Sequence, residues 1–375
     1  MMKIYMDNAA TTRVTEPVFE AMKPYFCESF GNASSIHGYG REAKKALENA
    51  RRQTAQALDC LPEEVFFTSC GSESDNWALK STLRPGDHLI TTKIEHHAIL
   101  HTAEALEKQG VSVTFLPVDG CGRVSSDSVR NAIRPETKLI SVMAVNNEIG
   151  TIEPVREISE LARSEGILFH TDAVQAVGNI PVSAHDFDML SLSGHKFHAP
   201  KGIGVLYVKK GLALPPFIDG GAQERRRRAG TENIAFIAGL GRAIEIACGS
   251  IAEKQAYVSS LTNRLLTGLT SAIPGVTLNG PEEGRIAGTL NLSFKDVGGE
   301  ALLLNLDLKG IAVSAGSACT AGSPEPSHVL SALGKGDEIV KSAVRFSLCE
   351  ENTPEEVETV IAETASIVEK IRAMR

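Results

Sequence analysis

Lys196 lies in a segment of small and polar residues that could position a reactive amine. The segment covers residues 193–202, SGHKFHAPKG, and follows an apolar run that ends at Leu192. A lysine whose ammonium pKa is lowered can form a Schiff base with an aldehyde. Most lysines in loops are solvated charges. Schiff-base formation is therefore indicated only if other residues that could bind a cofactor lie near Lys196.

Two further segments carry side chains that a charged aromatic cofactor would need. Asp172 ends an apolar run and could pair with a protonated ring nitrogen, although aspartate at such a position is equally often a helix N-cap. Gly71 and Ser72 follow a predicted strand and open a predicted helix, where N–H groups and a hydroxyl could bind an anion. That turn alone is a weak signal. Because ligands bind at the carboxyl ends of strands in open α/β sheets, Lys196, Asp172 and this turn together predict one site.

Of the seven cysteines, Cys319 is the one whose sequence surroundings favour a reactive thiol. Residues 314–326 are small, polar and rich in glycine and proline, which predicts a loop that exposes the thiol to solvent. Elsewhere a cysteine is more often buried and inert, but an accessible thiolate is a nucleophile. The seven cysteines, at 27, 60, 70, 121, 248, 319 and 349, include no pair at CxxC spacing, which argues against structural zinc.

Three histidines raise the alternative of a metal site. His96, His97 and His101 are close in the sequence, and positions 97 and 101 share one face of a predicted helix. Histidine is a common metal ligand. No carboxylate or cysteine cluster completes a ligand set around them, so we expect no metal.

Short apolar runs alternate with helical patterns over the first two thirds of the chain. A helix at 39–58 comes before the first of these strands. The alternation favours a largely parallel, doubly wound α/β sheet with helices on both faces. The predicted strands are 65–68, 88–92, 111–116, 139–143, 168–170, 189–192 and 204–208, and the predicted helices between them are 73–83, 98–109, 126–133 and 155–165.

The pattern changes near residue 250 and predicts a smaller α+β domain. A long helical stretch over 233–272 is followed by strands at 289–294, 312–314 and 343–348. The final helix opens with Thr353, a proline and Glu356, a capping box. We expect a large domain at 13–255 and a small domain formed by 1–12 with 256–375.

The composition is that of an ordinary globular protein. The 375 residues are 42% hydrophobic and 22% charged with a net charge of −8, which gives no reason to expect nucleic acid as a partner. The basic run at 225–228 is an exception, and such a run is usually a solvated surface. No stretch of eighteen apolar residues occurs, and the first residues lack the apolar core typical of a signal peptide, so we expect no membrane span and a cytoplasmic location.

Eight motifs follow one another along nearly the whole chain. They are YMDNAATT at 5–12, the turn at 68–76, EHHA at 95–98, VNNEIG at 145–150, HTDAVQ at 170–175, the lysine segment at 193–204, RAGTEN at 228–233 and the cysteine segment at 316–327. Together they resemble the cysteine desulfurases of the NifS/IscS type, which belong to the class V aminotransferase group of pyridoxal-phosphate (PLP) enzymes. The resemblance implies PLP fold type I, with a large, mostly parallel seven-stranded sheet domain and a smaller α+β domain.

The resemblance also implies roles around the cofactor ring. Lys196 would hold PLP covalently and later move protons, with His96 stacked on the ring and assisting. Asp172 would bind the pyridine nitrogen and Gln175 the phenolate oxygen. Asn147 would lie beside the ring and contact both cofactor and substrate.

Other matching residues would bind phosphate and substrate. Arg345 would clamp the substrate carboxylate with help from Asn32, although an ion pair at a sheet edge is the alternative for this arginine. The family more often has threonine at position 72 and proline after Asn32. The phosphate ligands would be Gly71, Ser72, Ser193 and His195, with Thr231 from the other subunit of a homodimer and part of the 225–228 run beside them.

The implied reaction converts L-cysteine to L-alanine and leaves the sulfur as a persulfide on Cys319. The loop at about 314–327 has the length found in the group that delivers sulfur to iron–sulfur scaffold proteins, although tRNA thiolation and other acceptors stay open. Three alternatives remain. One is another class V PLP enzyme, a selenocysteine lyase or an aminotransferase, and the second is a non-catalytic iron–sulfur assembly scaffold. The third is a basic nucleic-acid binder, which the net charge and the lack of a nucleic-acid-reading motif disfavour.

Overall fold

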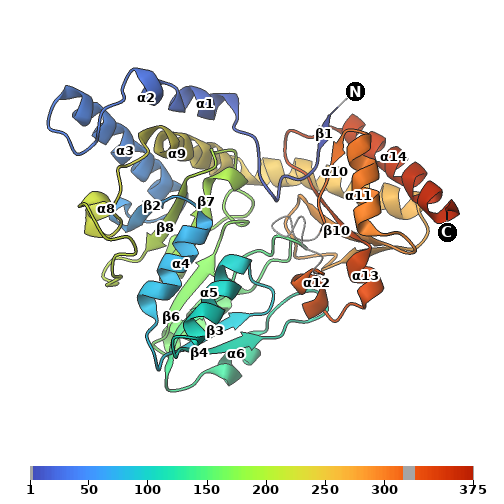
Figure 1. The fold of residues 1–375 in the computed structure, drawn as a ribbon, viewed down its shortest axis with the longest axis horizontal. Coiled ribbons are helices and arrows are strands. Elements are labelled where there is room, and N and C mark those ends of the chain that lie inside the picture. Colours follow the sequence, from blue (N-terminus) through green and yellow to red (C-terminus); the bar gives the residue numbers. More distant parts are fainter. Residues whose placement is uncertain (1–2, 316–325, 375) are drawn as a thin grey trace.

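The computed structural model describes residues 3–315 and 326–374, so Cys319 lies outside the described residues. Figure 1 shows a large sheet with helices on both faces, and beside it a second group of helices and strands from the last third of the chain. The N-terminal strand β1 (Ile4–Tyr5) lies in this second group, because it pairs in parallel with β11 (Ile311–Ala312).

The large sheet has seven strands in the order β2-β8-β7-β6-β5-β3-β4. The strands from β7 to β4 pair in parallel, whereas β8 pairs antiparallel with both β2 and β7. The mostly parallel sheet predicted from the alternation is therefore confirmed. Its strands are β2 (Val65–Thr68), β3 (His88–Thr92), β4 (Ser112–Leu116), β5 (Thr137–Ser141), β6 (Leu168–Asp172), β7 (Met189–Ser193) and β8 (Gly204–Val208).

Apolar side chains on both faces of the sheet are buried, which is why its strands read as continuous apolar runs. Phe67 and Ile90 face a core shared with helices α3, α7 and α9, whereas their neighbours Phe66 and Leu89 face a core shared with α4 and α5. The helices of this part are α1 (Glu16–Met22), α2 (Pro24–Cys27), α3 (Gly38–Ala57), α4 (Gly71–Thr82), α5 (His97–Glu107), α6 (Ser126–Ala132), α7 (Val155–Ser164), α8 (Gln223–Arg226) and α9 (Ile234–Gly249).

The second group builds its own core around an antiparallel sheet of order β12-β10-β9. Ile4 and Met6 from the N-terminus pack into this core. The domain boundaries themselves stay a prediction. The elements are α10 (Ile251–Ala272), β9 (Val276–Asn279), β10 (Thr289–Phe294), α11 (Gly299–Leu308), α12 (His328–Ala332), α13 (Asp337–Lys341), β12 (Ala343–Ser347) and α14 (Pro354–Ala373).

Several predicted helices and strands differ from the structure by one or two residues at their ends. The stretch predicted as helical over 233–272 consists of two helices, α9 and α10, which are separated at Ser250 and bent by 73°. The strand predicted at 312–314 ends at Ala312, and Ser314 forms only an isolated bridge with Arg345.

Among the described residues, no single helix is long and apolar enough to cross a membrane. The bent pair α9 and α10 reaches that length and composition only when its two helices are counted together.

Candidate active site

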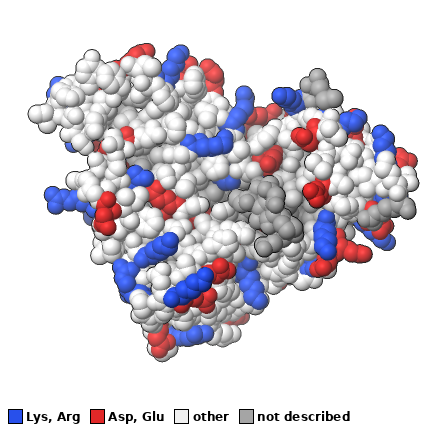
Figure 2. All heavy atoms as spheres, viewed as in Figure 1, with Lys and Arg blue, Asp and Glu red and all other residues white. Residues whose placement is uncertain are grey.

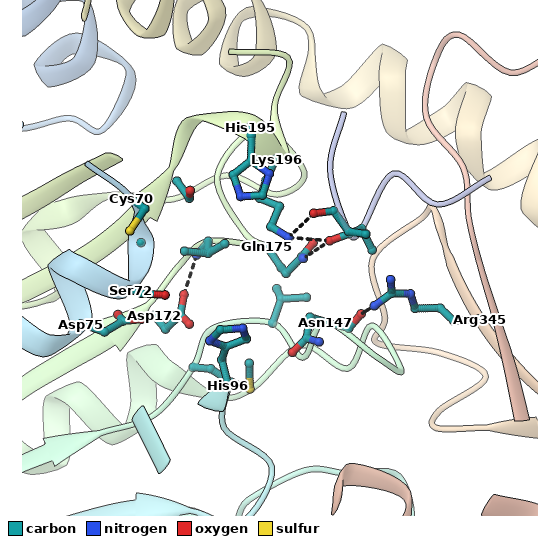
Figure 3. A pocket seen from close by; sticks show the side chains of 17 residues that line it. Cys70, Ser72, Asp75, His96, Asn147, Asp172, Gln175, His195, Lys196 and Arg345 are labelled. Carbon is teal, nitrogen blue, oxygen red and sulfur yellow. Dashed lines mark hydrogen bonds between the residues drawn. The ribbon is translucent and has the colours of Figure 1, made fainter. Parts of the chain in front are cut away.

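A cavity of about 340 Å³ lies at the carboxyl ends of the parallel strands. Its position follows from the fold, because the loops after β6 and β7 and the start of α4 meet there. Figure 3 shows the side chains that line it. They include ten of the residues predicted from the sequence: Gly71, Ser72, His96, Asn147, Asp172, Gln175, Ser193, His195, Lys196 and Arg345.

The amine of Lys196 is positioned by the N-terminal segment. Its Nζ donates to the carbonyl oxygens of Ala9 and Ala10, each at 2.8 Å. The Gln175 side-chain amide donates to the same Ala9 oxygen at 2.9 Å (Figure 3). The backbone of residues 9–10 therefore holds both side chains toward the cavity.

Asp172 and Asp75 form a buried pair of carboxyl groups in the wall of the cavity. Burial raises the pKa of Asp172, and burial with the neighbouring Asp172 raises the pKa of Asp75 well above its usual value. Two carboxylates in one buried site repel each other, so one of them keeps a proton. Because the Val174 N–H donates to Asp172 at 2.9 Å and the Lys196 cation lies near it, Asp172 is the group that ionises first.

Two histidines of the cavity are neutral near pH 7. Burial, with the Lys196 cation, lowers the pKa of both His96 and His195 to about 4. His96 precedes α5, and its Nδ1 accepts a hydrogen bond from the Ala98 N–H at 3.1 Å. A neutral imidazole in this place can accept a proton, which is what a general base requires.

The start of α4 forms the end of the cavity that suits an anion. The N–H groups of the first turn of a helix have no partner within the helix, and the helix dipole adds positive potential. A Cβ added at Gly71 would lie 2.8 Å from Val174 Cγ2 and 3.3 Å from Ser193 Cβ, so only glycine fits without displacement. The hydroxyls of Ser72 and Ser193 line the same part of the cavity.

The basic run at 225–228 divides into two environments. Arg228 pairs with Glu73 at 2.8 Å, which places its guanidinium beside the first turn of α4. The guanidinium groups of Arg225 and Arg227 lie over the ring of Phe66, at 4.3 and 5.2 Å from its centroid.

On the face drawn in Figure 2, lysine and arginine side chains lie interspersed with aspartate and glutamate.

Arg345 lies at the side of the cavity that faces the small domain. Its side chain is 1% exposed, and its Nη1 donates to the Asn147 carbonyl at 2.9 Å (Figure 3). Its Nη2 donates to Asp7 Oδ1 at 2.8 Å. The guanidinium is therefore held in one orientation from two sides.

Two predicted site residues do not line the cavity. Asn32 is exposed in the loop before α3, where its Oδ1 accepts from the Ser34 N–H at 2.9 Å. Thr231 lines a separate pocket with Arg228. Cys319 lies outside the described residues. Their roles stay predictions.

Sequence reasoning missed four contributors to the site. They are the carboxyl groups of Asp7 and Asp75, the Cys70 side chain in the cavity wall, and the backbone carbonyls of residues 9–10. Asp7 lies inside the YMDNAATT motif, so that motif was the signal for it. No sequence pattern predicts which backbone carbonyl will accept a hydrogen bond from a side chain of the site.

The comparisons with known proteins agree over nearly the full length of the chain. The family model for aminotransferase class-V matches residues 4–360. The chain is 51% identical to "Cysteine desulfurase IscS" of Methanosarcina thermophila over 99% of this chain and 93% of that protein. It is 48% identical to "Cysteine desulfurase IscS" of Clostridium botulinum strain Hall over 99% of this chain and 96% of that one.

Solved structures give the same result. A "NIFS-LIKE PROTEIN" superposes with a TM-score of 0.93 at 39% identity, covering 98% of this chain and all of that one. A structure described as "SspA in complex with cysteine" gives a TM-score of 0.83 at 35% identity, covering 94% of this chain and all of that one. With the family model, the curated relatives and the cavity in agreement, the chain belongs to the class V aminotransferase family, among its cysteine desulfurases of the NifS/IscS type.

Proposed function

We propose that this protein is a PLP-dependent cysteine desulfurase that converts L-cysteine to L-alanine and retains the sulfur as a persulfide on Cys319. The observation that carries the proposal is the grouping of Lys196, Asp172, the start of α4 and Arg345 around one cavity. An amine, a carboxylate, an anion site and a guanidinium are the groups needed to hold PLP and an amino acid side by side.

The residues of the cavity fit PLP. Gly71, Ser72, Ser193 and His195 offer N–H and hydroxyl groups for the phosphate, and the space above Gly71 is kept open by its missing Cβ. Asp172 would hold the ring nitrogen, Gln175 the phenolate oxygen and His96 the ring face. Bound there through Lys196, PLP would supply an aldehyde for the substrate amine and a sink for the electrons of the Cα–H bond.

The chain's own groups would then bind the substrate and move its protons. Arg345 would bind the α-carboxylate through two parallel N–H···O bonds, the geometry for which guanidinium is suited. Asn147 lies beside it, and Asn32 would assist. Lys196, once its amine is released, would take the Cα proton and return protons to the product, with the neutral His96 imidazole as its partner.

Cys319 would perform the sulfur transfer. Its thiolate would attack the substrate sulfur, so that one S–S bond forms and the Cβ–S bond of the substrate breaks. The electron pair of that bond stays on carbon and takes a proton, which gives L-alanine. The sum is enzyme thiol plus L-cysteine to enzyme persulfide plus L-alanine, with no external oxidant or reductant.

The partners follow from the same proposal. A homodimer would bring Thr231 of one subunit to the phosphate of the other, with Arg228 held nearby by Glu73. A sulfur-acceptor protein, such as an iron–sulfur scaffold, would take the persulfide sulfur. The cytoplasmic location stays a prediction.

Mass spectrometry of the purified protein after addition of L-cysteine tests the reaction and the nucleophile together. We expect one added sulfur atom on the Cys319 peptide and L-alanine as the product. Cys319→Ser should lose the persulfide and the sulfide release while keeping the yellow cofactor absorbance. Sulfide release by Cys319→Ser at the wild-type rate would overturn the assigned nucleophile, and a protein that stays colourless with PLP would overturn the cofactor.

A further inference from the structure

A histidine, a cysteine and a glutamate meet beside the lysine loop and have no part in the reaction proposed above. His198 follows Lys196 by two residues, and Cys349 and Glu350 lie in the turn between β12 and α14. The potential ligand atoms of these three side chains all lie within 4.8 Å of one another. His198 is buried, Cys349 is half-buried and Glu350 is exposed, so solvent reaches the cluster from the Glu350 side.

The imidazole of His198 is fixed in one orientation. Its backbone has φ of 69°, a left-handed conformation that is unfavourable for a non-glycine residue and persists only when the surroundings hold it. Thr12 Oγ1 accepts the His198 N–H at 2.8 Å, and the Arg13 carbonyl lies 3.0 Å from Nδ1. A carbonyl oxygen only accepts, so Nδ1 carries a proton and Nε2 faces the cluster. Metal-binding histidines typically donate their second N–H to a carbonyl or carboxylate in this way.

The turn that carries the other two side chains is also held in place. The Cys349 N–H donates to Asn352 Oδ1 at 3.0 Å. The Asn352 amide donates in turn to the Tyr5 carbonyl and to Glu356, each at 2.9 Å. Strand β1 and helix α14 therefore fix the position from which Cys349 approaches His198.

The arrangement suits a shared cation better than a nucleophilic triad. In a triad the imidazole uses one nitrogen for the nucleophile and the opposite nitrogen for the carboxylate. Here the Arg13 carbonyl occupies Nδ1, so Cys349 and Glu350 are left with the Nε2 side. Glu350 Oε1 lies 3.6 Å from Nε2. Two ligands of a tetrahedral zinc ion, with bonds of about 2.0–2.3 Å, are separated by roughly 3.3–3.7 Å.

We infer that His198 Nε2, Cys349 Sγ and the Glu350 carboxylate bind a zinc ion, with water as the fourth ligand. A nitrogen, a thiolate and a carboxylate form a ligand set of the kind zinc accepts, and the two negative ligands balance its charge. The ion would tie the loop of Lys196 to the small domain. The sequence gives no signal for such a site, because the proposed ligands lie 151 residues apart (349 − 198) and form no sequence motif.

Zinc binding to the full-length, PLP-loaded protein tests the inference without any measurement of activity. All proteins carry Cys319→Ser, so that the proposed sulfur acceptor cannot bind the ion. After chelator treatment and addition of Zn²⁺, we expect about one tightly held zinc per chain by elemental analysis and a rise in Tm. Cys349→Ala and Glu350→Gln should each weaken binding about tenfold or more. With Co²⁺ as a probe, Cys349→Ala should also remove the thiolate-to-cobalt absorption band.

Three control variants separate this site from others on the protein. Cys121→Ser removes an exposed thiol, Glu351→Gln removes the adjacent carboxylate that pairs with Arg13, and His101→Gln disrupts the contact with His97. Each control should bind zinc like the parent. Absence of stoichiometric zinc from the parent, or equal binding by the parent and Cys349→Ala, overturns the inference. Loss of zinc only in His101→Gln overturns it as well. Glu350 is exposed, so its variant stays folded and keeps the test valid if Cys349→Ala does not fold.

Discussion

Arg345 and Asp7, 338 residues apart in the sequence, are joined by a 2.8 Å hydrogen bond between Nη2 and Oδ1. The pair connects β12 to the N-terminal segment whose carbonyls hold Lys196. The Arg345 guanidinium, which we propose binds the substrate carboxylate, and the Lys196 amine are therefore positioned by the same short stretch of chain.

Arg345→Lys should raise the KM for L-cysteine about 10- to 100-fold, because an ammonium keeps only one of the two parallel hydrogen bonds and each charge-assisted bond contributes about 1.5–3 kcal/mol. Cofactor absorbance should not change. Steady-state kinetics with spectra of the same samples measures both. Asp7→Asn keeps the shape of the partner and should raise KM by a smaller factor. An unchanged KM in Arg345→Lys would contradict the proposed carboxylate clamp.

Gly71→Ala should weaken PLP binding about tenfold or more, because the new methyl group would overlap Val174 and press on Ser193. Titration of the cofactor-free protein with PLP, followed by absorbance, gives the affinity. Gly120→Ala is the matched control, since no heavy atom lies within 4 Å of the Cβ it would add. Equal affinities of the two variants would show that the start of α4 does not bind the phosphate.

Glu153→Gln should flatten the dependence of stability on pH. Burial raises the pKa of Glu153 from its usual 4.5 to about 8. A carboxyl with a raised folded-state pKa stabilises the fold fully below pH 4.5, and this contribution is lost as pH rises through 8. The variant should therefore gain stability relative to the wild type between pH 5 and pH 8. Melting temperatures across this range measure it, and the exposed neighbour Glu157→Gln should follow the wild type.

Arg51→Ala should lower the free energy of unfolding by about 3–5 kcal/mol, because it leaves the Glu224 carboxylate buried without its partner. The two side chains are each 3% exposed and are joined by hydrogen bonds of 2.8 and 2.9 Å. Thermal or urea unfolding measures the change. Arg51→Met with Glu224→Gln should recover part of the loss, and Arg52→Ala on the exposed face of α3 should be nearly neutral. A loss below 1 kcal/mol in Arg51→Ala would show that the pair is not a structural link.

The strands of the large sheet were predictable because strands that are buried on both faces consist of consecutive apolar residues. The strands at 65–68, 88–92 and 204–208 have the predicted bounds. The antiparallel direction of β8 was not predictable, since pairing direction leaves no local pattern in a strand buried on both faces. The break at Ser250 was missed because both α9 and α10 have helical sequence patterns up to it.

The sequence by itself determined the alternating α/β order, the lysine loop, the turn that we propose binds an anion, and the family to which the chain belongs. Short-range patterns carry this information, because helix and strand periods and motif spacings lie within a few residues of one another. Tertiary structure alone decided which distant groups meet: Asp7 with Arg345, Asp75 with Asp172, and His198 with Cys349 and Glu350. Such pairs depend on how the small domain and the N-terminal segment pack against the sheet. Packing is a property of the whole chain, and no local stretch of sequence encodes it.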